Sequence, residues 1–169
     1  DTGLDTDANG EIDRAAIVEA TVRVRADGCG PRTELGTGTS IGDGLVITAA
    51  HVGAGATRVE IVDRFGATVD ADVVSFDPDL DVAALRPARD IASPPVVLRS
   101  ERGQQGERGV VAVISADGTA EPLAADVLQR VTVRTTDIYL EQSVERPGLR
   151  IGVGIEPGDS GAMVHLPGG

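Results

Sequence analysis

The sequence predicts an all-β protein built from two barrels. Two observations predict this fold class. Short apolar segments, many of them alternating with polar residues, recur along the chain and are separated by turn signals such as the dipeptide Asp43-Gly44. Heptads and internal repeats are absent, so the pattern favours barrels or sandwiches over helical architectures. A connector without apolar residues, 99–108, divides the strand-rich sequence into two blocks, which indicates two barrels.

We divide the chain into three parts on this basis. Residues 1–20 are an acidic linker that ends in a short helix within 11–20, and 21–98 form the first barrel. Residues 99–169 form the second barrel. The strands are expected in the first barrel at 22–25, 36–42, 45–50, 57–63, 67–76, 80–87 and 94–98, and in the second at 110–116, 123–135, 138–143, 149–154 and 161–166.

The composition limits the classes of function. The chain of 169 residues is 41% hydrophobic, which is enough for a buried core, and it carries a net charge of −12. All of its basic residues are Arg. An acidic surface repels phosphate backbones and anionic lipid, and with 2% aromatics the chain has few stacking platforms, so the composition disfavours nucleic acid and membrane-surface partners. No segment is long and apolar enough to span a membrane, and the acidic segment that begins at Asp1 does not have the pattern of a signal peptide.

Three residues in three separate segments point to nucleophilic catalysis. His51 follows the apolar strand in "VITAAHV", Asp81 directly precedes the apolar "VAAL", and Ser160 lies in "PGDSG". A serine nucleophile needs a base to take its proton and a carboxylate to orient that base. Each segment alone is ordinary: a turn, a packed histidine, a strand boundary. Their occurrence together, in this order within an all-β pattern, predicts a serine hydrolase.

The three segments resemble the catalytic blocks of chymotrypsin-fold serine proteases. The blocks are "GTGTSIGDGLVITAAHV", "DPDLDVAALRP" and "GIEPGDSGAM", and the resemblance covers about residues 21–169. Their spacing is similar to bacterial trypsin-like proteases of the Deg type. The "GCG" before the first block and "TDIYLEQ" before the last resemble the actinobacterial, membrane-anchored acid-resistance proteases. One departure is "GAM" after the nucleophile, where the family has Gly-Gly-Pro.

The resemblance implies an all-β fold of two Greek-key β-barrels packed together. It also implies a serine endopeptidase that acts on protein or peptide substrates outside the cytoplasm and needs no cofactor. His51 is the general base, Asp81 its orienting carboxylate and Ser160 the nucleophile. The amides of Gly158 and Ser160 are the oxyanion donors. Asp79 competes for the role of Asp81, which we prefer because it directly precedes the apolar strand. The alternative function is a catalytically silent homologue that binds peptides or regulates a partner.

The substrate pocket and the partner of Asp159 are less determined. The segment 153–158 would wall the pocket, and Gly154 and Ile155 favour small or medium apolar side chains. Glu156 would favour basic side chains if it faces the pocket; solvent exposure is the alternative. For the carboxylate of Asp159 we expect an internal arginine partner, with three candidates: Arg130, Arg134 and Arg150.

The end of the chain predicts an incomplete second barrel. Barrels of this family have six strands, whereas the second block offers five candidates and ends in a turn-like "PGG". In the resembling proteins a further strand follows and Cys29 has a disulfide partner near the C-terminus. Cys29 is the only cysteine. Truncation, proteolytic removal and a remainder held as a separate chain all stay open, as do a buried free thiol at Cys29 and an anchor in a longer precursor.

A second motif resembles a calcium-binding loop, but we interpret it as an acidic turn. Asp5, Asp7, Asn9 and Asp13 follow the ligand spacing of an EF-hand calcium loop. The twelfth position is Ala16, where a bidentate Glu is required, so we expect no metal; calcium regulation is the alternative. His165 alternates with Met163 on the last expected strand, and we interpret it as a strand residue.

Overall fold

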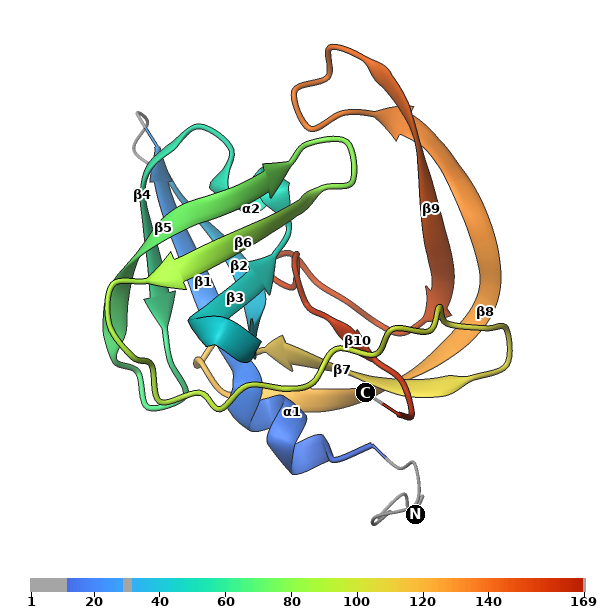
Figure 1. Cartoon of the computed structure of the whole chain (residues 1–169), viewed down its shortest axis with the longest axis horizontal. Helices are drawn as coiled ribbons and strands as arrows, with labels where there is room; N and C mark the ends of the chain where they lie inside the picture. The colour runs from blue at the N-terminus through green and yellow to red at the C-terminus, as the bar shows by residue number, and fades with distance from the viewer. Residues whose placement is uncertain (1–11, 29–31, 169) are drawn as a thin grey trace.

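Six antiparallel strands close into the first barrel (Figure 1). The computed structural model describes residues 12–28 and 32–168. The barrel order is β1-β2-β3-β6-β5-β4, and β4 pairs back with β1. Its strands are β1 (Thr21–Gly28), β2 (Thr33–Ile41), β3 (Leu45–Thr48), β4 (Ala56–Val62), β5 (Thr68–Asp77) and β6 (Val82–Pro87).

The alternation of residues in β1 explains the core of this barrel. Val22, Val24 and Ala26 are buried, whereas the arginines between them are only partly buried. This period of two places one face of the strand inside the barrel. The inward residues pack against one another as a single cluster: Val22, Val24, Ala26, Val46, Val52, Val59, Ile61 and Leu85.

The short helix that precedes β1 packs against the second sheet. In α1 (Arg14–Ala20) the Asp13 carboxylate accepts a hydrogen bond from the Ala16 amide and caps the first turn. Ile17 on this helix packs against Val110 and Ala112 of β7. None of the helices within the described residues is long and apolar enough to cross a membrane.

The second sheet curls without closing. Its order is β10-β7-β8-β9, with β7 (Arg108–Ile114), β8 (Ala120–Thr136), β9 (Ser143–Gly152) and β10 (Val164–His165). Strand β7 is buried on both faces, whereas most of β8 is exposed or only partly buried. The architecture is therefore a chymotrypsin-like double barrel whose second barrel lacks its last strand, as the sequence predicted.

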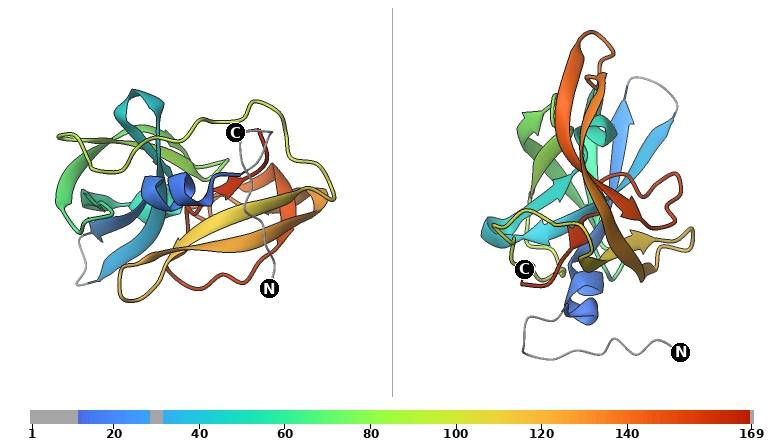
Figure 2. Two further views of the ribbon diagram at one scale, coloured as in Figure 1. Left: turned by 90° about the horizontal axis from the view of Figure 1, so that it is seen from below. Right: turned by 90° about the vertical axis from the view of Figure 1, so that its right-hand side faces the viewer.

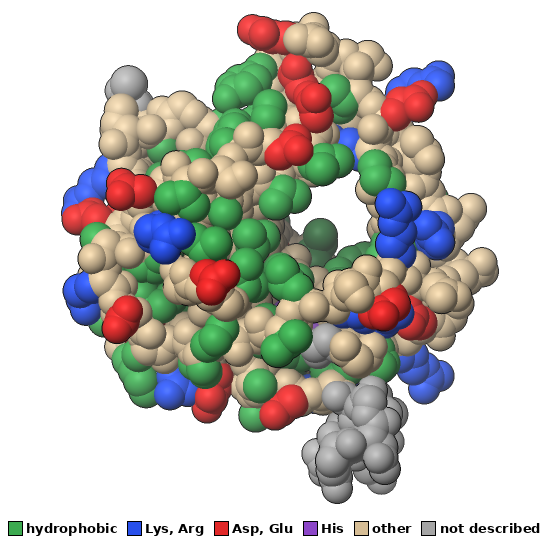
Figure 3. Space-filling view, viewed as in Figure 1, with side chains coloured by type: hydrophobic (Ala, Val, Ile, Leu, Met, Phe, Trp, Pro, Cys, Tyr) green, Lys and Arg blue, Asp and Glu red, His purple; other side chains and the backbone are tan. Residues whose placement is uncertain are grey.

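The hairpin of β8 and β9, which we call the arm, rises beside the first barrel (Figure 2). Its tip approaches the turn between β5 and β6. The space-filling view shows an opening between the arm and the first barrel, with apolar side chains on its rim (Figure 3).

Two of the expected strands are wrong. Residues 94–98 form no strand, and only Val96 makes an isolated bridge, to Ile41. Two prolines remove the amides that would extend the pairing. Residues 138–142 form the turn of the arm, because the Asp137 carboxylate accepts the amides of Tyr139 and Glu141. Most of the expected strand 138–143 is thus a capped loop, and Leu140 within it has a φ of 61°.

Candidate active site

The register of two strands brings His51 and Asp81 together. Thr48, the last residue of β3, pairs with Ala83 near the start of β6. His51 follows β3 on the helical turn α2 (Ala50–Gly53), and Asp81 directly precedes β6. Since antiparallel neighbours place the end of one strand beside the start of the next, the two residues meet at one edge of the first barrel.

The Asp81 carboxylate holds His51 with both of its oxygens. One oxygen accepts the main-chain amide of His51 at 2.8 Å, and the other lies 2.8 Å from Nδ1 of the ring. With Asp81 ionised, Nδ1 carries the proton and Nε2 keeps its lone pair. Asp81 has a φ of 59°, a conformation that costs a non-glycine residue about 1 kcal/mol. Asp79, the competing carboxylate, makes no contact of this kind with His51 among the described residues.

The segment that carries Ser160 is attached to the first barrel. The Thr37 amide donates to the Ser160 carbonyl at 2.8 Å, and the Thr37 hydroxyl donates to the Gly158 carbonyl at 3.1 Å. A Cβ on Gly161 would lie 2.5 Å from the Thr48 hydroxyl and would also overlap the Thr37 carbonyl, so only glycine allows this approach. Ser160 is therefore positioned by residues three and fourteen places before His51.

Two amides beside Ser160 stay available as donors. Gly158 has a φ of 105°, which favours glycine. The amides of Asp159 and Ala162 are bound within the loop, to the carbonyls of Glu156 and Asp159. Within the described part of the chain, the amides of Gly158 and Ser160 donate to no protein acceptor. The amides of Gly158 and Ser160, the two predicted oxyanion donors, are thus free to bind a ligand.

Comparisons with known proteins identify the family of this chain. The family described as trypsin-like peptidase domain matches residues 36–169. The chain belongs to this family. The active form of the Rv3671c protease from M. tuberculosis is 30% identical, with a TM-score of 0.82 over 89% of this chain and 66% of that one. Its inactive form gives a TM-score of 0.75 at 30% identity, over 89% and 74% of the two chains.

A more distant structure shares the fold. The HtrA-type protease AlgW with a bound tripeptide is 20% identical, with a TM-score of 0.72 over 89% of this chain and 48% of that one. The chain therefore spans about two thirds of the Rv3671c protease structure in its active form and about half of AlgW. No curated protein is detectably similar in sequence.

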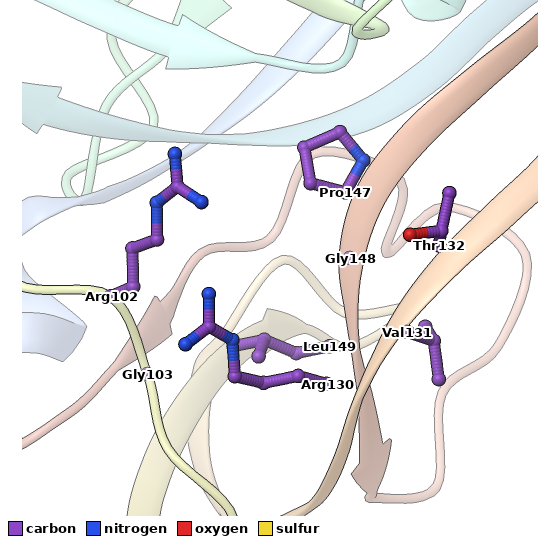
Figure 4. Close-up of a pocket in the computed structure, with 8 residues that line it drawn as sticks. All are labelled: Arg102, Gly103, Arg130, Val131, Thr132, Pro147, Gly148 and Leu149. Atoms are coloured by element: carbon purple, nitrogen blue, oxygen red, sulfur yellow. The ribbon is translucent and has the colours of Figure 1, made fainter.

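The expected arginine partner of Asp159 in this trypsin-like peptidase domain is wrong. The buried Asp159 carboxylate accepts the main-chain amide of Glu156 at 2.7 Å, and no ion pair to it occurs among the described residues. Arg134 pairs instead with Glu145 on the surface of the arm. Arg130 lines a cavity inside the curl of the second sheet with Arg102, Pro147 and Leu149 (Figure 4). A carboxylate satisfied by its own loop needs no distant cation.

Two of the three predicted pocket residues line the same groove. Gly154 and Glu156 line a groove of about 720 Å³ between the nucleophile loop, the start of β2 and the β7–β8 turn. Ile155 is 63% exposed and does not line this groove. Arg23 also borders the groove and donates to the Ser115 carbonyl at 2.8 Å.

Several predicted residues lie outside the described part of the chain. These are Cys29 and three of the four calcium candidates, Asp5, Asp7 and Asn9. The fourth, Asp13, caps α1. His165 lies in β10 and is buried, and its burial lowers the pKa to about 4.

Sequence reasoning missed the residues that connect the two halves of the site. Thr37 binds the nucleophile loop twice, although a threonine between two glycines gave no signal beyond strand propensity. Arg146 is the second residue that connects the two halves, and it lies within ion-pair distance of Asp81. It comes 65 positions later in the sequence, so nothing local links it to the carboxylate.

Proposed function

We propose that this chain contains the catalytic centre of a serine endopeptidase. The observation that carries the proposal is the pair of hydrogen bonds by which Asp81 holds His51. The loop with Ser160 and the free amides of Gly158 and Ser160 is attached to the same barrel. The roles follow from the chemistry of each group. Ser160 is the nucleophile, His51 the general base, and Asp81 the carboxylate that orients the base.

The reaction passes through an acyl-enzyme. Nε2 of His51 takes the proton of the Ser160 hydroxyl while its oxygen attacks the peptide carbonyl. The developing oxyanion accepts hydrogen bonds from the amides of Gly158 and Ser160, and Asp81 stabilises the imidazolium that forms. His51 then returns the proton to the leaving amine, and water releases the acyl group by the same route in reverse.

The similarity to relatives supports the proposal. The chain gives a higher TM-score to the active form of the Rv3671c protease than to its inactive form. AlgW carries a tripeptide in its structure, which favours a peptide as the class of ligand. The resemblance to Deg-type proteases favours an extracytoplasmic location in a bacterium, with a protein or peptide as substrate.

A fluorophosphonate probe tests the proposal. It should label the full-length protein at neutral pH, and Ser160→Ala should abolish the labelling. His51→Ala should reduce labelling by at least about a hundredfold, because the hydroxyl loses its base. Ser143→Ala, at an exposed serine on the arm, is the matched control and should label like the wild type.

Two outcomes would contradict the proposal. Absence of labelling in the folded full-length protein would indicate a catalytically silent homologue. Equal labelling of the Ser160→Ala variant would place the reactive group elsewhere.

A further inference from the structure

The arm of the second sheet reaches the carboxylate that holds His51. Arg146 lies on β9, and its side chain is only 18% exposed. One guanidinium nitrogen lies 3.7 Å from the Asp81 carboxylate, on the oxygen that also contacts the His51 ring. A single carboxylate oxygen is therefore shared between an imidazole and a guanidinium.

The same guanidinium connects the arm to the turn that leads into Asp81. Its second nitrogen donates to the Pro78 carbonyl at 3.3 Å and to the Thr136 carbonyl at 3.3 Å. Pro78 lies three residues before Asp81, and Thr136 ends β8 at the tip of the arm. The third nitrogen, Nε, is buried without a hydrogen-bond partner in the described structure. Such a buried cation is unfavourable unless a carboxylate compensates it.

Asp81 is the one carboxylate within 4.0 Å of this guanidinium among the described residues. The other charged groups of the neighbouring segments either bind elsewhere or have no partner among the described residues. The Asp77 carboxylate accepts the Leu80 amide within its own turn, and Asp79 is exposed and unpaired. On the arm, Glu145 pairs with Arg134, and Asp137 caps the tip loop.

We propose that Arg146 is a positioning residue for the Asp81–His51 pair, which reaches from the arm to hold the carboxylate that orients His51. The proposal rests on the proposed function for its catalytic consequence. With the arm in place, the positive charge at Asp81 opposes protonation of the ring, so the unprotonated base persists to lower pH. Without this guanidinium, Asp81 loses one of its anchors, and the ring is protonated at higher pH.

Two substitutions separate the charge of Arg146 from its hydrogen bonds. Arg146→Gln keeps an amide donor for the carbonyls but removes the charge, whereas Arg146→Lys keeps the charge and removes the fork of donors. Arg134→Met removes a second arginine of the arm that pairs only on the surface, and it is the matched control. Each variant is made in the full-length protein.

The direct measurement is an NMR titration of the His51 ring, with its signal assigned by its loss in His51→Ala. We expect the midpoint of Arg146→Gln to rise by roughly half to one pH unit, and that of Arg146→Lys and Arg134→Met to stay within about 0.2 units of the wild type. The acid limb of kcat/KM should shift by the same amount in Arg146→Gln. A folded Arg146→Gln with an unchanged midpoint, or equal midpoints for the Gln and Lys variants, would overturn the proposal.

The titration does not need hydrolysis, so the two proposals fail separately. If the midpoint rises in Arg146→Gln but no variant reacts with the fluorophosphonate probe, only the endopeptidase function is refuted. If the probe labels Ser160 and the midpoint stays fixed, only the role of Arg146 is refuted.

Discussion

Both halves of this protein are built from antiparallel strands, but one half is a closed barrel and the other an open sheet. The first barrel is closed, and each of its strands pairs on both edges. The second sheet has four strands, and both β9 and β10 have a free edge among the described residues. The difference appears in burial: β7 is almost fully covered, whereas β8 is longer and largely exposed.

This contrast shows how the site is held. Closure of the first barrel fixes His51 and Asp81 through the pairing of β3 with β6. The loop of Ser160 belongs to the open sheet, yet its hydrogen bonds to Thr37 attach it to the closed barrel. The closed half therefore positions the residues of both halves, and the following experiments test that division.

The largest expected effect comes from the junction of the halves. Gly161→Ala should lower probe labelling of Ser160 by about a hundredfold or more, because the methyl group would overlap the Thr37 carbonyl and displace the loop. Gly42→Ala is the control, since a Cβ there meets nothing within 4 Å. Comparable labelling in the two variants would show that the loop is not held by this close approach.

The second effect concerns the free edge of the open sheet. Burial lowers the pKa of His165 in β10 to about 4, below its ordinary value of 6.5. The unfolded chain therefore binds a proton that the folded chain refuses, and stability falls as the pH drops from 6.5 towards 4, by up to about 3 kcal/mol. Urea unfolding at pH 7 and pH 5 measures this loss. In His165→Gln the difference between the two pH values should shrink; an unchanged difference would assign it to the carboxylates.

A matched pair of valines compares the two halves directly. Val46 in the first barrel is 0% exposed, and Val133 on the arm is 44% exposed. Val46→Ala should lower the free energy of unfolding by about 2 kcal/mol, because it removes buried methyl groups and leaves a cavity. Val133→Ala should change it by less than about 0.5 kcal/mol. Chemical denaturation measures the free energy of unfolding of both variants. Equal losses of stability would mean that the arm is covered in solution.

The smallest expected effect isolates one hydrogen bond between the halves. Thr37→Val removes the hydroxyl that donates to the Gly158 carbonyl and keeps the amide that binds Ser160. Stability should fall by about 1 kcal/mol, the usual contribution of such a bond. Thr37→Ser retains the hydroxyl and should stay close to the wild type. If both variants lose the same stability, the methyl group of Thr37 matters more than its hydroxyl.

The predictions from sequence were accurate where local pattern and tertiary environment coincide. Strands of the first barrel alternate because one face is buried, and turn residues mark their ends, so β3, β4 and β6 lie close to their expected positions. The pattern of apolar residues predicted a strand wrongly in the arm, where tertiary contacts are few. Residues 138–142 contain apolar side chains, yet the Asp137 carboxylate turns them into a loop.

The sequence by itself determined the fold class, the family and the three segments that carry His51, Asp81 and Ser160. Each of these is encoded in residues that are neighbours along the chain: alternation, turn dipeptides and short motifs. Only the tertiary structure decided that Asp159 is bound by its own loop, that Thr37 attaches the nucleophile segment, and that Arg146 reaches Asp81. These contacts join residues whose proximity depends on strand register and on the curl of the second sheet, and neither leaves a local signal in one sequence.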